Sequence, residues 1–134
     1  MDRPAVEQWI AAYRRAWASD APADIAALFT EDATYSPYPW PRDREPWRGR
    51  DVIIDKWTER GDSGAGWRFD HEVLAVDGDT AVIEGWTYYD PTDATPHEDA
   101  YANIWVVRFA TDGRARSFAE YWVQRPVREE ATEA

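Results

Sequence analysis

The spacing of apolar residues changes once along this chain, and that change limits the possible folds more than any other feature. From Pro4 to Ser19 the apolar side chains recur with the i, i+3, i+4, i+7 spacing of an amphipathic helix. From Trp67 onward the pattern is that of β-strands separated by tight turns. Helices first and strands afterwards predict an α+β fold, in which helices pack against one sheet.

Two shorter helices are expected between these halves. The first begins at Ala21-Pro22, because proline is tolerated in the first turn of a helix. The second runs from Asp51 to Arg60, and Gly61 would end it. One face of the helix that begins at Ala21-Pro22 is expected to carry Ile25, Leu28 and Phe29.

Four strand-like runs occupy the second half of the chain. Turn signals at Asp77-Gly78-Asp79 and Thr111-Asp112-Gly113 join consecutive runs, so we expect an antiparallel meander. A short strand is also expected at Ala33–Tyr35. The inward phase of residues 80–90 is ambiguous, because Val82 and Ile83 are both apolar. The four runs are Trp67–Val76, Thr80–Asp90, Tyr101–Ala110 and Arg114–Gln124.

The chain is rich in large rings, with nine Trp, seven Tyr and four Phe. Tryptophan is hard to bury completely and its N–H needs a partner, so some of these rings should line a cavity or an interface. Residues 36–49 form a loop with four prolines. This loop carries Tyr38, Trp40 and Trp47, and we expect it to fold over another part of the molecule.

Charge and composition exclude several classes of function. The formal net charge of −11 disfavours nucleic acid and anionic membranes as partners. The absence of cysteine excludes disulfides and thiolate metal sites. With no secretion signal and no apolar run of about 20 residues, a cytoplasmic protein is expected. The length predicts one domain at 1–126 and an acidic, disordered tail at 127–134.

A metal site is not expected either. His97 stands beside Glu98 and Asp99, but three consecutive residues rarely direct their side chains at one ion. His71 lies mid-strand beside charged residues and is expected to be exposed. We therefore expect neither a metal nor a cofactor.

Four local strings, in order, indicate a family. They are Phe29–Tyr35, Gly49–Ile53, Asp112–Arg114 and Phe118–Trp122. Together they resemble SnoaL-like bacterial proteins of the nuclear-transport-factor-2-like superfamily, from about residue 5 to 125. The resemblance implies a cone-shaped fold with three N-terminal helices on a curved antiparallel sheet. It implies no single reaction, because this superfamily includes isomerases, cyclases, epoxide hydrolases, dehydratases and binding proteins.

Two reactions known in the superfamily are disfavoured by the residues at the matching positions. Ketosteroid isomerases use a tyrosine, a carboxylate base and a protonated aspartate. Tyr13 matches the tyrosine, but the base falls at about Pro37 and the aspartate at about Trp105, and neither can move a proton.

Limonene epoxide hydrolases resemble the chain at one catalytic position. Their last-strand aspartate corresponds to Glu120. Their arginine and second aspartate correspond roughly to Gly85 and Thr87, so the assembly that orients water is incomplete.

Glu120 is the best candidate for acid–base chemistry. Residues 118, 120 and 122 share one face of a strand. The resemblance places this face inside the cone and turns Tyr101, Asn103 and Trp105 of the adjacent strand inward as well. Desolvation there would raise the pKa of Glu120 toward the working range. The alternatives are a solvated or ion-paired Glu120, and a Tyr13 that only packs in the core.

Two functions remain open at this point. One is a SnoaL-like small-molecule pocket protein, which as an enzyme would be an isomerase, cyclase or hydro-lyase that transfers protons on an apolar, ring-containing substrate with Glu120 and Tyr13. The other is a non-catalytic ligand-binding or dimerisation module whose core is filled by its own rings. A homodimer through the outer sheet face is expected, with Trp86, Tyr88 and Tyr121 as candidates for that face. The ligand-binding candidates are Trp17, Tyr35, Trp40, Trp57, Tyr101, Asn103, Trp105, Phe118 and Trp122.

Overall fold

Helix α1 (Arg3–Ser19) carries the apolar face on which the core is built. The computed structural model describes residues 1–60 and 66–126. At the start of α1, the Asp2 side chain caps the helix by accepting a hydrogen bond of 2.9 Å from the Ala5 N–H. At its end, Asp20 adopts a left-handed conformation with φ 52° and its N–H bonds back to Ala16. The buried face consists of Val6, Trp9, Ile10, Tyr13 and Ala16.

The second helix is shorter than the sequence predicts. Helix α2 spans Pro22–Ala26, so the expectation that Leu28 and Phe29 belong to its face is wrong. The carbonyl of Leu28 accepts hydrogen bonds from the Trp9 indole and from the Ala115 N–H, which draws the chain out of the helix. Phe29 then begins strand β1 (Phe29–Ser36), which is longer than expected. Both residues are fully buried.

Helix α3 (Arg50–Arg60) agrees with the predicted third helix. The expected stop at Gly61 and the expected disordered tail at 127–134 lie outside the described residues. Within the part of the chain that is described, no helix is both long and apolar enough to cross a membrane.

The strands form one six-stranded sheet in the order β2-β1-β6-β5-β4-β3. The predicted antiparallel meander is confirmed for β3 to β6. Strand β1 pairs in parallel with β6, so the sheet is mixed and not purely antiparallel. A parallel pair needs a long crossover, and the sequence pattern indicates only pairs that tight turns join. The remaining strands are β2 (Trp47–Arg48), β3 (Trp67–Asp77), β4 (Thr80–Tyr89), β5 (Asp99–Phe109) and β6 (Ala115–Gln124).

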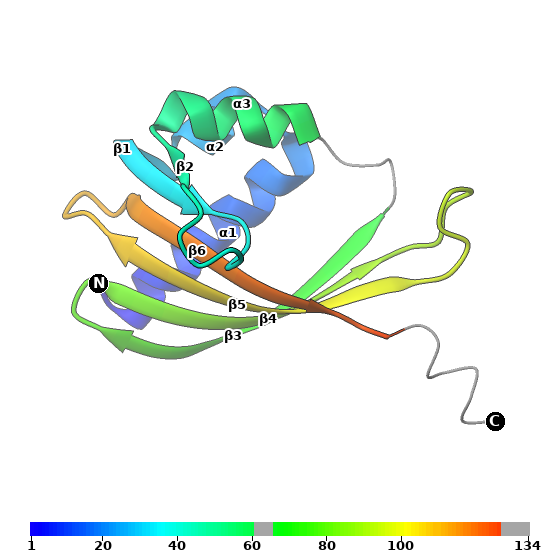
Figure 1. Ribbon diagram of the computed structural model, residues 1–134. Coiled ribbons are helices and arrows are strands. Elements are labelled where there is room, and N and C mark those ends of the chain that lie inside the picture. The colour runs from blue at the N-terminus through cyan, green and yellow to red at the C-terminus, as the bar shows by residue number, and fades with distance from the viewer. Residues whose placement is uncertain (61–65, 127–134) are drawn as a thin grey trace.

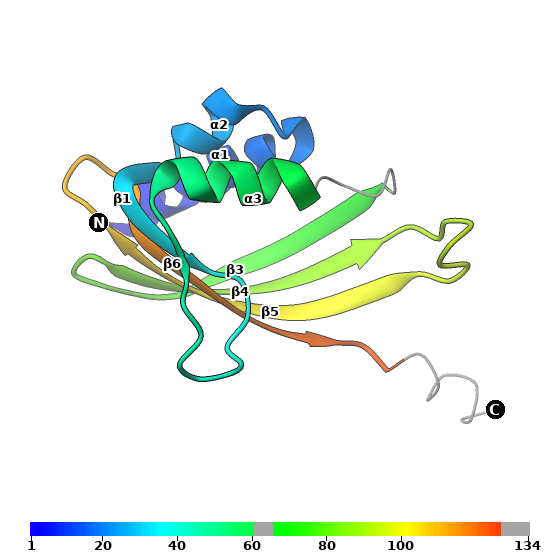
Figure 2. The same cartoon turned by 45° about the horizontal axis from the view of Figure 1, so that its top comes forward.

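The helices cover one face of this curved, open sheet (Figure 1). The loop between β1 and β2 extends past the opposite face (Figure 2). The core lies between α1 and the sheet, where Trp9 packs its ring edge-on against Phe29 and Phe109. The expected α+β arrangement, with N-terminal helices packed on a curved sheet, is therefore confirmed.

The phase of β4 is resolved by burial. Ala81, Ile83 and Thr87 are buried on the helix side, whereas Trp86 is 44% exposed on the other side. Gly85 belongs to the buried side and lies beneath the ring of Phe69 in β3. A Cβ atom at residue 85 would lie 2.5 Å from Phe69 Cε1. Only glycine allows this ring to lie so close to the sheet.

We predict that Gly85→Ala lowers the free energy of unfolding by about 1–3 kcal/mol, the usual cost of overpacking a core. Phe69 cannot move aside easily, because it is 2% exposed and stacks on Trp105 at 5.0 Å. Urea denaturation of the variant measures the effect. Glu84→Ala, on the opposite face of the same strand, should change the stability by less than about 0.5 kcal/mol. Equal stability of Gly85→Ala and the native protein would contradict the prediction.

Candidate functional site

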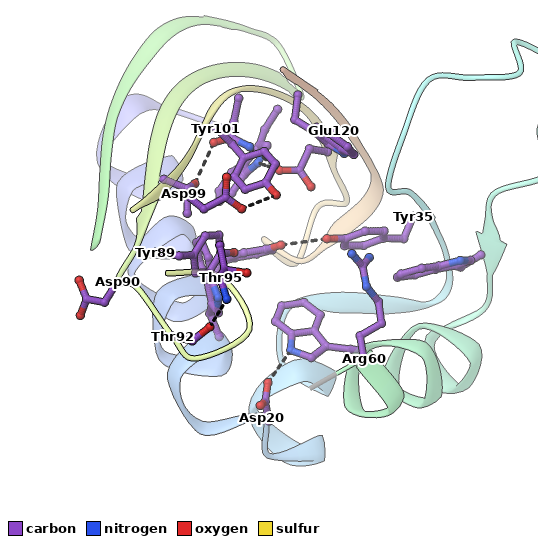
Figure 3. Close-up of a pocket in the computed structure, with 18 residues that line it drawn as sticks. Asp20, Tyr35, Arg60, Tyr89, Asp90, Thr92, Thr95, Asp99, Tyr101 and Glu120 are labelled. Atoms are coloured by element: carbon purple, nitrogen blue, oxygen red, sulfur yellow. Dashed lines mark hydrogen bonds between the residues drawn. The ribbon is translucent and has the colours of Figure 1, made fainter. Parts of the chain in front are cut away.

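A cavity of about 640 Å³ opens between the helices and the wide end of the sheet (Figure 3). The aromatic core fills the opposite end, and β4 and β5 continue past the helices toward the cavity (Figure 1). The cavity therefore begins where the layer of core rings stops. Its lining residues are Tyr13, Trp17, Asp20, Tyr35, Trp47, Trp57, Arg60, Thr87, Tyr89, Asp90, Thr92, Thr95, Asp99, Tyr101, Asn103, Trp105, Glu120 and Trp122.

Glu120 is held at the inner end of this cavity by two hydrogen bonds to one oxygen. Its Oε2 accepts 2.9 Å from Asn103 Nδ2 and 3.1 Å from Trp105 Nε1. Its Oε1 accepts no hydrogen bond from residues 1–60 or 66–126. Burial raises the pKa of Glu120 above its ordinary value, and the two donors and the positive charge of Arg60 offset that rise only in part.

Asn103 is itself oriented by Thr87. The Thr87 hydroxyl donates to Asn103 Oδ1 at 2.8 Å, which leaves the amide N–H free to donate to Glu120. Both side chains are nearly inaccessible, at 3% and 7% exposure. The chain Thr87–Asn103–Glu120 therefore fixes the carboxyl group before any ligand arrives. Thr87 corresponds roughly to the second catalytic aspartate of limonene epoxide hydrolases. In this protein it orients Asn103 instead.

A pair of tyrosine hydroxyls lies beside the carboxyl group. The Tyr13 and Tyr35 oxygens are 2.9 Å apart and either can be the donor. Burial, followed by the charge of the neighbouring Tyr35, raises the pKa of Tyr13 well above its ordinary value. Burial, followed by the charge of Glu120, raises the pKa of Tyr35. Both therefore stay protonated at neutral pH, and one O–H finds no acceptor in residues 1–60 and 66–126. That O–H can donate to a ligand.

Hydrogen bonds fix the aromatic walls. The Trp57 indole donates to Asp20 at 3.1 Å, and the Trp122 indole donates to the carbonyl of Pro37 at 3.1 Å. The Tyr101 hydroxyl donates to Asp99 at 2.9 Å, and burial raises the pKa of Tyr101 to about 12. These three rings are held in place before a ligand binds, because the polar tip of each already has a partner.

Most of the residues expected from the sequence line this cavity. From α1 come Tyr13 and Trp17, from β1 comes Tyr35, and from α3 comes Trp57. Strand β5 contributes Tyr101, Asn103 and Trp105, and β6 contributes Glu120 and Trp122. Their inward direction agrees with the alternation predicted for the two neighbouring strands.

Two expected ligand contacts do not reach the cavity. Phe118 is 1% exposed and stacks under Tyr35 at 4.5 Å, so it belongs to the core. Trp40 is 63% exposed and lies on the loop that extends past the far face of the sheet (Figure 2). The reason is that Tyr38, and not Trp40, packs against Trp122 at 4.8 Å.

Sequence reasoning missed several lining residues, including Trp47, Arg60 and Thr87. Trp47 could have been found from the sequence, because it is a large ring in a proline-rich loop. Thr87 becomes identifiable only after the phase of β4 is known. Within residues 1–60 and 66–126, no three His, Cys, Asp or Glu side chains are arranged to hold a metal ion. His71, expected to be exposed, is partly covered and bonds to Glu7 at 2.6 Å.

Comparison with known proteins places this geometry in a family. Residues 10–118 match the SnoaL-like domain. The chain belongs to the SnoaL-like family. This confirms the family indicated by the four sequence strings. The curated proteins contain no match to this SnoaL-like chain.

Solved structures share the fold of this SnoaL-like protein at low sequence identity. A Caulobacter vibrioides protein with a cystatin-like fold is 19% identical, with a TM-score of 0.67 over 97% of this chain and 93% of its own. A cystatin-like protein of Methylobium petroleophilum PM1 is 19% identical, with a TM-score of 0.70 over 95% of this chain and 81% of its own. An LEH-like epoxide hydrolase of M. tuberculosis is 15% identical, with a TM-score of 0.64 over 87% and 80% of the two chains. These similarities support the fold alone.

The raised pKa of Glu120 predicts a pH-dependent stability. Ionising the buried carboxyl group costs more in the folded chain than in the unfolded chain. Its stabilising contribution is complete below the ordinary pKa of 4.5 and is lost as the pH rises through the higher folded value. Glu120→Gln cannot ionise, and its amide oxygen can still accept from Asn103 and Trp105. Its melting temperature should therefore exceed that of the native protein increasingly from pH 4 to pH 8.

Thermal unfolding followed by circular dichroism across this pH range measures the difference. Glu84→Gln on the outer face controls for the loss of one negative charge. A difference in melting temperature that does not change with pH would contradict a raised pKa at Glu120.

Proposed function

We propose that this protein binds a small, apolar, ring-containing molecule in the cavity and transfers a proton on it with Glu120. The observation that carries the proposal is the Glu120 carboxyl group, which is enclosed at the inner end of a cavity of about 640 Å³ with one oxygen fixed by Asn103 and Trp105. Small-molecule sites usually have about 300–1,000 Å³ and mostly apolar walls with a few placed polar groups.

The groups in the cavity suit cofactor-independent proton transfer next to a carbonyl group. Ionised Glu120 removes a proton from the carbon beside the carbonyl, and the C–H electron pair moves into a new C=C bond. The carbonyl oxygen gains negative charge and accepts a hydrogen bond from the free O–H of the Tyr13–Tyr35 pair. Return of the proton to a different atom completes an isomerisation. Attack of the carbon on a second carbonyl would give a cyclisation, and loss of hydroxide would give a dehydration.

The alternative is a non-catalytic module with a self-filled core. A cavity of about 640 Å³ argues against the self-filled version, because its own rings leave space above the lower range of about 300 Å³ for ligand sites. The experiment below distinguishes a protein that only binds the ligand from one that also catalyses proton transfer. Epoxide hydrolysis is disfavoured, because Gly85 lies against Phe69 and Thr87 is engaged by Asn103.

Hydrogen–deuterium exchange tests the proton transfer before a natural substrate is identified. Bicyclic ketones such as 2-tetralone are incubated with the protein in D₂O, and loss of the α-proton signal is followed by NMR. The native protein should accelerate exchange above the buffer rate. Glu120→Gln should lower this acceleration by about 100-fold or more, the usual contribution of a general base. The rate should rise with pH as Glu120 ionises.

Glu84→Gln is the matched control, because it removes a carboxylate from the opposite face of the sheet. Its exchange rate should equal that of the native protein. Equal acceleration by native protein and Glu120→Gln would remove Glu120 as the base. Binding of the ketone without acceleration by the native protein would favour the non-catalytic alternative.

We also propose that the protein is a homodimer through the outer face of the sheet. The support is an exposed apolar surface on this face, where Trp86 is 44%, Tyr121 48% and Val123 70% exposed. A second copy of the chain would cover these side chains.

Analytical ultracentrifugation at micromolar concentration tests the dimer. We expect the mass of two chains for the native protein and of one chain for the double variant Trp86→Lys/Tyr121→Lys. Val52→Lys is the control, because Val52 is 41% exposed on α3, which lies on the helix side of the sheet. A native protein that sediments as a monomer would contradict this proposal.

A further inference from the structure

Among the described residues that line the cavity, Arg60 is the only arginine or lysine. It lies in the last turn of α3, and its side chain extends toward Tyr35 at the cavity (Figure 3). The guanidinium carbon lies 5.8 Å from the centre of the Trp47 ring, which in turn stacks on Tyr35 at 4.9 Å. A planar ring thus supports the cation at the rim and connects it to the inner hydroxyl pair.

Among the residues that the structure describes, no acidic side chain neutralises this cation. In residues 1–60 and 66–126, Arg60 makes neither an ion pair nor a hydrogen bond. This is unexpected in a chain with 26 acidic and 15 basic residues. Other arginines do have carboxylate partners, as Arg48 has Glu45 at 3.3 Å and Arg116 has Asp79 at 2.8 Å.

Two of the aspartates that line the cavity already accept hydrogen bonds from other side chains. Asp20 accepts a hydrogen bond from Trp57, and Asp99 accepts from Tyr101 and Gln124. The side chain of Asp90 points away from the other labelled side chains (Figure 3). The charge of Arg60 does reach the inner end of the cavity, because it lowers the pKa of both Tyr35 and Glu120. Within the described part of the chain, the rim therefore offers one planar donor that no carboxylate pairs with.

We propose that Arg60 binds a carboxylate of the ligand, so that this cavity prefers ring compounds that carry a carboxylate over uncharged ones. This inference rests on the proposed function, in that the ligand occupies the cavity. A guanidinium group matches the planar geometry of a carboxylate through two parallel hydrogen bonds. Held there, the ligand's carboxylate lies beside α3, and its ring system extends into the cavity toward Glu120. Arg60 thus selects and orients the ligand.

Three matched pairs of probes test this inference: benzoate and benzamide, 2-naphthoate and 2-naphthamide, and anthracene-2-carboxylate and its carboxamide. Dissociation constants are measured by isothermal titration calorimetry. The native protein should bind at least one carboxylate about tenfold tighter than its amide, the effect of a charge-assisted hydrogen bond. Arg60→Gln should weaken the carboxylate by about tenfold, to the level of the amide, and should leave the amide unchanged.

Two further variants separate a local contact from a general charge effect. Arg116→Gln removes the same charge from an ion pair with Asp79 outside the cavity, and it should keep the preference. Arg60→Lys keeps the charge without the planar fork and should retain only part of the preference. Circular dichroism and thermal unfolding check that each variant is folded.

Each outcome decides between the two proposals. Equal affinity of the native protein for both members of every bound pair would overturn the role of Arg60 and leave ligand binding intact. A preference that persists in Arg60→Gln would do the same. Failure of all six probes to bind the native protein would overturn the role of Arg60 together with the binding part of the proposed function. A preference lost in Arg60→Gln, in a protein that shows no proton exchange, would support Arg60 and overturn only the catalysis.

Discussion

The parallel pairing of β1 with the first half of β6 determines where the core ends and the cavity begins. The two strands pair as far as Ser36 and Ala119, and Pro37 then ends β1 because proline has no N–H for the ladder. Phe118 lies within the paired half and is buried in the core. Glu120 is the first residue of β6 beyond it, paired only with β5. One strand therefore supplies a core ring and, two residues later, a group that faces a ligand space.

The electrostatic character of the cavity depends on which of its titratable side chains are uncharged. The protein as a whole is strongly acidic, with a net charge of −11. Inside the cavity, burial favours the uncharged forms of Glu120, Tyr13 and Tyr35. The inner end is thus a set of hydrogen-bonding groups with little charge, while charged side chains, the Arg60 cation on Trp47 and three aspartates, lie elsewhere in the lining. A ligand experiences a gradient from charge at the entrance to neutral polar groups at depth.

Much of this site follows from the sequence, for a physical reason. Side chains alternate along a strand, so the inward direction of Glu120 fixes that of Trp122, and the neighbouring strand behaves in the same way for Tyr101, Asn103 and Trp105. Alternation alone does not say which face of a strand is turned inward, and the family resemblance indicates that face.

The remaining features depend on contacts between distant parts of the chain. The parallel partner of β1 is more than 75 residues away in sequence, and no local pattern indicates it. Trp40 points outward because Tyr38 occupies the place against Trp122, a competition between two similar rings. Arg60 is a common residue at the end of a helix, and only the fold brings it to a cavity.

The paired hydroxyls of Tyr13 and Tyr35 have a consequence that needs no movement of heavy atoms. Because either oxygen can be the donor, the pair has two arrangements that differ only in the rotation of two O–H bonds. In one arrangement the free proton belongs to Tyr13 and in the other to Tyr35. A rigid wall can thereby present its hydrogen-bond donor at either of two positions, and so follow negative charge that shifts from one oxygen of a bound molecule to another.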